Sequence, residues 1–324
     1  MNETGSRRIV VLDNLAQRGL DMLEASDGID FQISTGLAGD ELRAALLDAD
    51  GAVCRSGVKI TADVLDGNTR LKAIARAGVG TDNIDKDAAS KQGIVVMNTP
   101  GGNTISTCEM TMALLLGMSR HIAPAYASLQ AGKWDRKKFQ GSQVEGKTLG
   151  IVGLGRIGWE VARRSQAFGM SIVGLDPFIT EDTAAAAGIK LVQTVHEMLP
   201  DVDYLTVHTP LTPETENLIS DAEIEIIKPG ARLINCARGG IFDEAALARG
   251  LESGKLAGVA LDVYPDEPCT DNPLFGMEGV LCTPHLGAST LEAQINVAVE
   301  AVEILIKFLK TGDATNPVNQ VAVA

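Results

Sequence analysis

The chain has 324 residues, and 28 Lys and Arg stand against 42 Asp and Glu, which gives a formal net charge of −14 at pH 7. A balance this acidic argues against a general nucleic-acid-binding protein and against electrostatic docking to an anionic membrane. With 45% hydrophobic and 22% charged residues, the composition is that of a globular protein, long enough for about two domains.

The longest apolar stretch is residues 112–118, far too short to cross a bilayer, so we expect no membrane segment. The five cysteines stand singly with no CxxC pair, which favours free thiols and a cytoplasmic location. Cys282 and His285 have the spacing of half a zinc site. No second ligand pair accompanies them in the sequence, so we predict no bound metal.

The first hundred residues alternate short apolar runs with amphipathic segments. Continuous apolar strands alternating with helices are typical of a parallel sheet covered on both faces. The predicted strands are 9–12, 31–34, 52–54, 71–75 and 94–97, with helices at 15–23, 41–47 and 85–91 and a long apolar helix at 105–120.

A second series of strands and helices begins at Thr148, so the predicted fold class is α/β with two doubly wound parallel sheets. Its strands are expected at 148–152, 171–175, 204–207, 232–235, 258–263 and 280–283, and its helices at 156–168, 182–187, 221–226, 244–252 and 291–309.

A glycine-rich turn follows the first strand of the second series. Gly153, Gly155 and Gly158 form the pattern G-x-G-x-x-G between a predicted strand and a predicted helix. Glycines there allow a tight turn and close approach of a pyrophosphate, whose charge is favoured at the helix amino terminus. Asp176 ends the next strand, 18 residues past Gly158, where a carboxylate accepts the ribose hydroxyls. No Arg follows it to hold a 2′-phosphate, so the sequence favours NAD over NADP.

Three polar motifs follow later strands of the same series, at the sheet edge where ligands bind in such folds. They place Arg238 in C-A-R-G-G, Glu267 in Y-P-D-E-P and His285 in P-H-L-G-A-S-T. This set suits the oxidation of a 2-hydroxy acid. A neutral imidazole takes the hydroxyl proton, a carboxylate stabilises the imidazolium, and a guanidinium clamps the substrate carboxylate. The alternatives are a surface ion pair for Arg238, a solvated acid at Glu267 and a structural His285.

Together the motifs G-L-G-R-I-G, N-C-A-R-G-G, L-D-V-Y-P-D-E-P and P-H-L-G-A-S-T resemble the D-isomer-specific 2-hydroxyacid dehydrogenase family over nearly the whole chain. The resemblance implies a Rossmann NAD-binding domain, 99–288, inserted into a flavodoxin-like substrate-binding domain, 1–98 and 289–324. It implies the catalytic set Arg238, Glu267 and His285. It further implies cofactor contacts beyond the glycines, namely Arg156, Ile157, Asp176, Thr209, Cys236 through its backbone, and Asp262.

Within the family, R-A-G-V-G-T-D-N-I-D, V-V-M-N-T-P and G-K-W-D-R-K-K-F are similar to the members that oxidise 3-phosphoglycerate to 3-phosphohydroxypyruvate for serine synthesis. Many of those carry a carboxyl-terminal regulatory domain, and this chain is expected to be a short form or a truncated one. One alternative is a glyoxylate or hydroxypyruvate reductase, or another D-2-hydroxyacid dehydrogenase. A different class of alternative is a non-catalytic NAD-sensing corepressor, against which the complete catalytic set argues.

A phosphorylated substrate would need local cations, because the chain as a whole is acidic. Arg55 and Arg76 follow predicted strands of the first sheet, and Arg136 lies in a basic run beside Trp134 that could equally be a solvated surface. The resemblance suggests that Arg136 reaches the site of a neighbouring subunit. The helix around 107–117 is apolar on nearly all sides, so it is expected in a core or, as the resemblance favours, in a homodimer or homotetramer interface.

Overall fold

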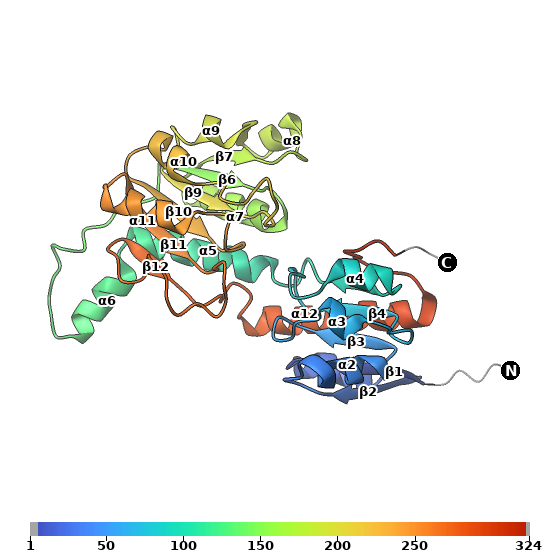
Figure 1. Cartoon of the computed structure of the whole chain (residues 1–324). Coiled ribbons are helices and arrows are strands. Elements are labelled where there is room, and N and C mark those ends of the chain that lie inside the picture. The colour runs from blue at the N-terminus through green and yellow to red at the C-terminus, as the bar shows by residue number, and fades with distance from the viewer. Residues whose placement is uncertain (1–5, 322–324) are drawn as a thin grey trace. The chain divides into compact units, whose positions relative to one another are not determined.

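The computed structural model describes residues 6–321, which form two compact units. Unit 1 consists of the residues up to Asn103 and those from Ala288 onward, and unit 2 runs from Thr104 to Gly287. The predicted domain limits lay at 98/99 and 288/289. Figure 1 shows that each unit contains one sheet with helices on both faces. Among the described residues, no helix is long and apolar enough to cross a membrane.

Unit 1 holds a five-stranded parallel sheet in the order β2-β1-β3-β4-β5. The strands run close to their predicted positions. They are β1 (Arg7–Val11), β2 (Ile29–Ile33), β3 (Gly51–Cys54), β4 (Ala73–Arg76) and β5 (Val95–Asn98), and the helices are α1 (Gln17–Glu24), α2 (Gly39–Leu47), α3 (Ala62–Leu65), α4 (Lys86–Lys91) and α12 (Leu291–Thr311).

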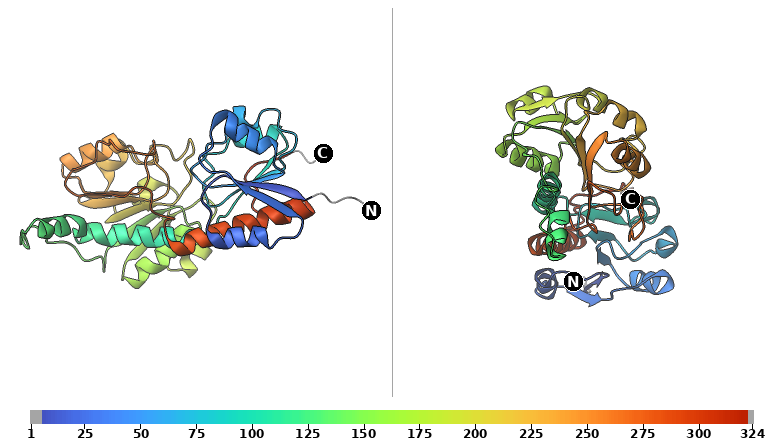
Figure 2. Two further views of the ribbon diagram at one scale, coloured as in Figure 1. Left: turned by 90° about the horizontal axis from the view of Figure 1, so that it is seen from below. Right: turned by 90° about the vertical axis from the view of Figure 1, so that its left-hand side faces the viewer.

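The two faces of this sheet are covered by different helices because successive strand side chains point to opposite sides. Val10 packs in the core beneath α2, α3 and α4, whereas Ile9 and Val11 pack against α1 and α12. Figure 2 shows α12, in red, lying beside α1 along one face. Thus the last long helix belongs to the same unit as the first strand, and the chain leaves unit 1 and returns to it.

Unit 2 holds a seven-stranded parallel sheet in the order β12-β11-β10-β9-β6-β7-β8. Its strands are β6 (Thr148–Val152), β7 (Ser171–Leu175), β8 (Ile189–Leu191), β9 (Tyr204–Val207), β10 (Ala231–Asn235), β11 (Leu256–Leu261) and β12 (Val280–Cys282), and its helices are α5 (Thr104–Ser119), α6 (Ile122–Gln130), α7 (Arg156–Ala167), α8 (Glu181–Ala186), α9 (Val195–Met198), α10 (Asp221–Ile226) and α11 (Glu244–Glu252).

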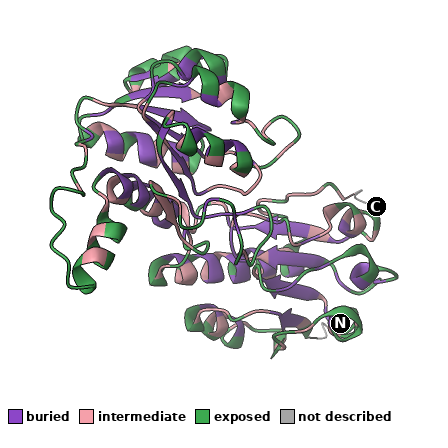
Figure 3. Ribbon diagram, turned by 60° about the vertical axis from the view of Figure 1, so that its left-hand side comes forward, coloured by how far each residue is buried: buried purple, intermediate pink, exposed green. Residues whose placement is uncertain are grey.

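Helix α5 accounts for the long apolar pattern around 107–117. It packs on α7 and on strands β10, β11 and β12, and Cys108, Leu114 and Leu115 are buried in the core of unit 2. As Figure 3 shows, most strands are buried while most helices keep one exposed face. The edge strands β2 and β12 are the exceptions, because none of their residues is buried. The pattern of α5 therefore follows from packing within one chain, and it requires no second subunit.

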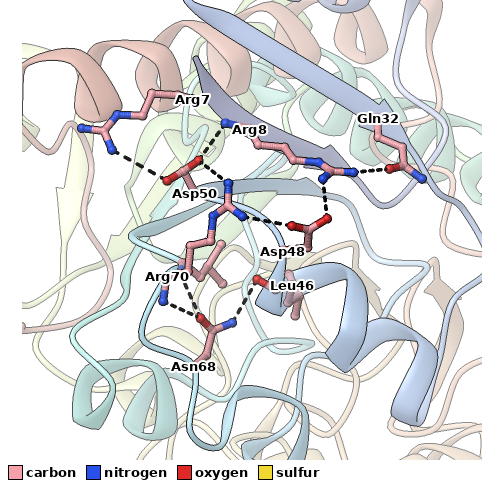
Figure 4. A network of polar contacts seen from close by, with 9 residues as sticks. Arg7, Arg8, Gln32, Leu46, Asp48, Asp50, Asn68 and Arg70 are labelled. Atoms are coloured by element: carbon pink, nitrogen blue, oxygen red, sulfur yellow. Dashed lines mark hydrogen bonds and ion pairs between the residues drawn. The ribbon is translucent and has the colours of Figure 1, made fainter. Parts of the chain in front are cut away.

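A network of charged side chains closes the amino ends of β1, β3 and β4 in unit 1 (Figure 4). The Asp50 carboxylate accepts the backbone N–H of Arg8 at 2.8 Å and lies 3.3 Å from Nη2 of Arg70. Asp48 pairs with both Arg8 and Arg70. Arg7, Arg8 and Arg70 thus form ion pairs at the amino ends of the strands. Arg55 and Arg76 lie at the opposite, carboxyl ends.

The segment after α12 pairs with the edge strand β5. The backbone N–H of Val318 donates to the carbonyl of Val96 at 2.8 Å. The amide of Asn319 accepts the N–H of Val96 at 2.8 Å and donates to the carbonyl of Ile94 at 2.9 Å. This pairing covers part of an edge that would otherwise present unpaired backbone groups.

Candidate active site

The glycine-rich turn lies at the point of the unit 2 sheet where the strand order reverses, between β6 and β9. Gly153 has φ of +92°, and a Cβ there would lie 2.7 Å from the carbonyl oxygen of His208. A Cβ on Gly158 would lie 2.0 Å from the carbonyl oxygen of Gly153. Nothing lies within 4 Å of a Cβ built on Gly155, the residue that caps α7. The turn is therefore tight on its inner side and open at the helix amino terminus, as phosphate binding requires.

Asp176 directly follows β7 and faces this turn. One carboxylate oxygen accepts the N–H of Leu154 at 2.8 Å, and the other accepts the N–H of Phe178 at 2.8 Å. Phe178 is 91% exposed, so the segment after Asp176 presents a ring and no guanidinium. Arg156 is exposed and Ile157 is half-buried in the first turn of α7. Asp176, Arg156 and Ile157, which were predicted to contact the cofactor, therefore lie around the glycine-rich turn.

Two buried polar atoms just after β9 have no hydrogen-bond partner among the described residues. The hydroxyl of Thr209 and Nδ1 of His208 are buried without a hydrogen bond to any described residue. Nε2 of His208 lies 3.2 Å from the hydroxyl of Thr206, and burial lowers the pKa of His208 to about 3, which keeps the ring neutral. A buried hydroxyl beside an open glycine turn fits a bound dinucleotide, because buried polar groups almost always have partners. His208 directly follows a central strand, a position typical of ligand-binding residues in such folds, but packing explains that position equally well.

The turn that carries Arg238 is held by Asn235, the last residue of β10. The buried Asn235 amide donates to the carbonyl of Arg238 at 2.7 Å and accepts the N–H of Ala237 at 2.9 Å. Nη1 of Arg238 donates to the carbonyl of Ala237 at 2.6 Å. These contacts fix the guanidinium at the carboxyl edge of the sheet.

Gly239 lets the Arg238 turn contact the loop that carries Glu267. A Cβ on Gly239 would lie 1.9 Å from the carbonyl carbon of Tyr264 and 2.2 Å from the nitrogen of Pro265. Only a residue without a side chain permits this backbone contact. The backbone N–H of Tyr264 in turn donates to Oε1 of Glu267 at 3.1 Å. The approach of the two loops therefore depends on this glycine.

His285 and Glu267 form a close pair at this edge. Nδ1 of His285 lies 2.6 Å from Oε2 of Glu267, and the two side chains are 48% and 35% exposed. His285 has φ of +53°, a left-handed conformation that costs a non-glycine residue about 1 kcal/mol or more and persists only where surrounding contacts impose it. Because Glu267 binds Nδ1, Nε2 is the ring nitrogen that can contact a ligand. The structure thus pairs two of the three predicted catalytic side chains.

Two other predicted cofactor contacts are buried. Cys236 follows β10, and burial raises the pKa of its thiol to about 12, so it is a neutral side chain near Thr111. Asp262 follows β11 and is 0% exposed. Its carboxylate accepts three internal hydrogen bonds, from the Thr283 hydroxyl at 2.6 Å and from the N–H groups of Leu286 and Gly287 at 2.7 Å each. Both of its oxygens are therefore engaged within the protein.

The predicted phosphate-binding cations lie in separate parts of the chain. In unit 1, Arg55 follows β3, its N–H donates to Asp13 at 2.6 Å, and its carbonyl accepts the Asn83 amide at 2.8 Å. Arg76 ends β4 and pairs in register with Cys54. In unit 2, Arg136 is exposed in the segment after α6.

The described residues contain no group of three or more His, Cys, Asp or Glu side chains placed to hold a metal ion. Among the described residues, Cys282 and His285 therefore lack the further ligands that a zinc site would need.

Comparison with known proteins places this geometry in a family. Residues 112–287 match the sequence profile of "D-isomer specific 2-hydroxyacid dehydrogenase, NAD binding domain". The chain therefore belongs to the D-isomer-specific 2-hydroxyacid dehydrogenase family, and unit 2 contains its NAD-binding domain.

Relatives that share most of the chain are known by a more specific activity. The chain is 45% identical over 312 residues to D-3-phosphoglycerate dehydrogenase of Methanocaldococcus jannaschii and 49% identical over 304 residues to that of Bacillus subtilis. These matches cover 96% and 94% of this chain but 59% and 57% of the relatives, so the chain spans about three fifths of their length. The solved TT0316 protein from Thermus thermophilus superposes with a TM-score of 0.87 at 35% identity, over 96% of this chain and 99% of that one.

Proposed function

We propose that this protein oxidises 3-phospho-D-glycerate to 3-phosphohydroxypyruvate with NAD as the hydride acceptor. The observation that carries the proposal is the 2.6 Å contact between Nδ1 of His285 and Oε2 of Glu267, in the same unit as the glycine turn. Supporting it, the relatives that cover most of this chain are phosphoglycerate dehydrogenases. When bound, NAD supplies the chemistry of accepting a hydride from C2 of the acid.

The side chains of this unit divide the remaining work. His285 removes the hydroxyl proton with its free ring nitrogen, because Glu267 occupies Nδ1 and stabilises the imidazolium that forms. Arg238 binds the substrate carboxylate, a planar anion that matches the guanidinium fork. Asn235 and Gly239 hold the Arg238 turn in place for this contact. The residues that take the proton and bind the carboxylate thus follow three different strands of one sheet, β10, β11 and β12.

For the substrate phosphate we propose Arg55 and Arg76 of unit 1, together with Arg136 reaching from a neighbouring subunit, as the family resemblance suggests. In support, Arg55 follows β3 and Arg76 ends the neighbouring strand β4, and Arg55 lies at the switch point between β1 and β3 where ligands bind in this topology. A phosphate brings about two negative charges at neutral pH, which an acidic chain collects only with local cations. A reductase of glyoxylate or hydroxypyruvate would not need them.

We also propose that NAD is preferred to NADP and that the protein is a homodimer or homotetramer. Asp176 without a following Arg disfavours a 2′-phosphate by charge repulsion.

For assembly, α6 has no buried residue, and it exposes Ile122, Tyr126 and Leu129 by 59%, 66% and 55%, followed by Trp134 at 82%. Such a contiguous apolar surface is typical of an interface. We expect Tyr126→Asp to yield a monomer by light scattering, and a monomeric wild type would contradict the assembly.

A substrate panel tests the function. Wild-type protein is assayed for NADH formation with 3-phosphoglycerate and with D-glycerate, which lacks the phosphate. We expect the phosphorylated acid to be preferred, and Arg55→Ala and Arg136→Ala each to raise its KM by about 10- to 100-fold, the effect of losing a hydrogen bond to a charged group. Lys72→Ala, which removes an exposed cation at the amino end of β4, is the matched control. Equal use of both acids with no effect of either Arg would favour a hydroxypyruvate reductase instead.

A further inference from the structure

The loop that carries Arg55 follows β3 in unit 1 and is partly exposed. Ser56 and Gly57 are exposed, whereas Val58 and Ile60 are 4% and 0% exposed. A loop with exposed residues keeps one conformation only where its backbone groups find partners within the protein. The contacts of this loop therefore decide where the Arg55 side chain begins.

One side-chain amide holds the loop at two points. Nδ2 of Asn83 donates to the carbonyl of Arg55 and to the carbonyl of Val58, each at 2.8 Å. An amide nitrogen of this kind has two N–H donors, so both are used within the loop. A side chain with a single donor could not bridge the two carbonyls in this way. Asn83 thus holds residues 55–58 together as a turn.

The backbone around Asn83 holds the same loop further along. The N–H of Ile60 donates to the carbonyl of Asn83 at 2.8 Å, and the N–H of Asp85 donates to the carbonyl of Ile60 at 2.8 Å. Asp85 is the residue that caps α4, where its side chain accepts the N–H of Ala88 at 2.9 Å. The Arg55 loop is therefore tied to the start of a helix of unit 1.

The other side of Arg55 is bound as well. Its N–H donates to Oδ2 of Asp13 at 2.6 Å, and Nη1 of its guanidinium donates to the carbonyl of Asn14 at 3.3 Å. Both backbone groups of Arg55 are thus engaged, the N–H by Asp13 and the carbonyl by Asn83. A guanidinium binds a phosphate best as an oriented fork, so the position of its backbone matters for affinity.

The neighbouring strand β4 is followed by a loop that is held in a similar way. The amide of Asn98, the last residue of β5, donates to the carbonyl of Val79 at 2.6 Å, three residues after Arg76. Asn83 and Asn98 belong to the motifs R-A-G-V-G-T-D-N-I-D and V-V-M-N-T-P. Each motif therefore contains an amide that binds the loop beside one Arg of the proposed phosphate site.

We propose that Asn83 is a positioning residue of the phosphate site, which sets the place of Arg55 by binding the carbonyls of residues 55 and 58. The inference rests on the proposed function only in assigning Arg55 to the substrate phosphate. Arg55 makes the contact, and Asn83 acts through it without touching the substrate. Loss of the Asn83 amide should therefore weaken the binding of phosphorylated acids and leave the chemistry at His285 unchanged.

Asn83→Ala removes both donors, and hydrogen exchange reports its effect on the loop. The peptide that spans residues 54–61 is measured without substrate or cofactor. We expect exchange to be faster by about tenfold or more, the effect of losing two hydrogen bonds on local opening.

Steady-state assays report the effect on the substrate. We expect Asn83→Ala to raise KM for 3-phosphoglycerate by about 5- to 20-fold, while kcat and the Kd for NADH change by less than about threefold. For D-glycerate, which lacks the phosphate, kcat/KM should change by less than about threefold. In the Arg55→Ala background, Asn83→Ala should raise KM no further, because a residue that acts through Arg55 has nothing left to position.

Two more variants complete the design. Asn83→Gln keeps both N–H donors one CH2 group further from the backbone, and it replaces Asn83→Ala if that variant fails to fold, with a rise in KM of about two- to fivefold. Asn68→Ala is the matched control. The Asn68 amide donates to the carbonyl of Leu46 at 3.0 Å near the amino ends of the strands (Figure 4), so its loss should leave KM and exchange in 54–61 unchanged.

The outcomes are distinct. Faster exchange in 54–61, with a rise in KM that disappears in the Arg55→Ala background, supports the positioning role. Unchanged exchange, an equal rise in KM with and without Arg55, or an equal loss of kcat/KM with D-glycerate would overturn it. If wild type uses both acids equally, the proposed function fails, and the exchange rates still decide whether Asn83 holds the loop.

Discussion

Replacing Glu267 with Gln isolates the charge of the pair it forms with His285. The amide keeps the size of the side chain and an oxygen for the Tyr264 N–H, so the loop should persist. The 2.6 Å bond to His285 is of the charge-assisted kind, worth about 1.5–3 kcal/mol when well shielded. Because the two side chains are 48% and 35% exposed, solvent screening reduces this to roughly 1–1.5 kcal/mol. A loss of this size makes a reaction about 5- to 12-fold slower.

The direction follows from the base role of His285. Glu267 stabilises the imidazolium that forms as His285 takes the hydroxyl proton, so the variant loses part of this stabilisation in the transition state. The assay is kcat/KM for NADH formation. We expect kcat/KM to fall by about 5- to 12-fold in Glu267→Gln. Asp266→Asn, an exposed acid one residue earlier, should leave kcat/KM in place. An unchanged kcat/KM in Glu267→Gln would refute the partnership.

Three further predictions concern the supporting structure. Gly239→Ala puts a Cβ within 1.9 Å of Tyr264, so kcat should fall by about 100-fold while NADH affinity persists, and full activity would contradict the close loop contact. The pKa of His208 is about 3 in the folded chain against an ordinary 6.5, so the unfolded chain binds more protons and stability falls as the pH is lowered through 6.5. Urea unfolding should show wild type losing roughly 2 kcal/mol more than His208→Asn between about pH 6.5 and 5, and parallel losses would refute this. Asn319→Ala should destabilise unit 1 by about 1–3 kcal/mol in the same assay by freeing the Val96 N–H, and an unchanged midpoint would argue against the edge pairing.

The elements that carry the site were predictable because most of their side chains are apolar. The bounds of β6, β7 and β9 are those expected from the sequence, since a central parallel strand buried on both faces leaves a continuous apolar run. Strand β8 was not expected. It is three residues long at the sheet edge, where Lys190 interrupts the apolar pattern. Helix α6 was also missed, although Pro124 stands in its first turn, where a helix tolerates proline.

The residue types of the site were predictable, and their partners were less so. Arg238, Glu267 and His285 stand out because polar groups follow apolar strands at the edge where ligands bind. The sequence could not reveal that Asp262 accepts hydrogen bonds from residues 21 to 25 positions later, since those bonds depend on the register of β11 beside β12. Nor could it show that α5 is buried within its own unit, because apolar patterning is the same in a core and in an interface.

The most direct test of the account is NADH consumption with 3-phosphohydroxypyruvate, measured for wild type and His285→Ala with the product isomer identified. We expect wild type to form the D isomer of 3-phosphoglycerate, and His285→Ala to lose at least about 100-fold in kcat while binding NADH normally, the size of a lost general acid or base. Wild-type protein that binds NADH but reduces no 2-oxo acid, or a fully active His285→Ala, would contradict the assignment of this site.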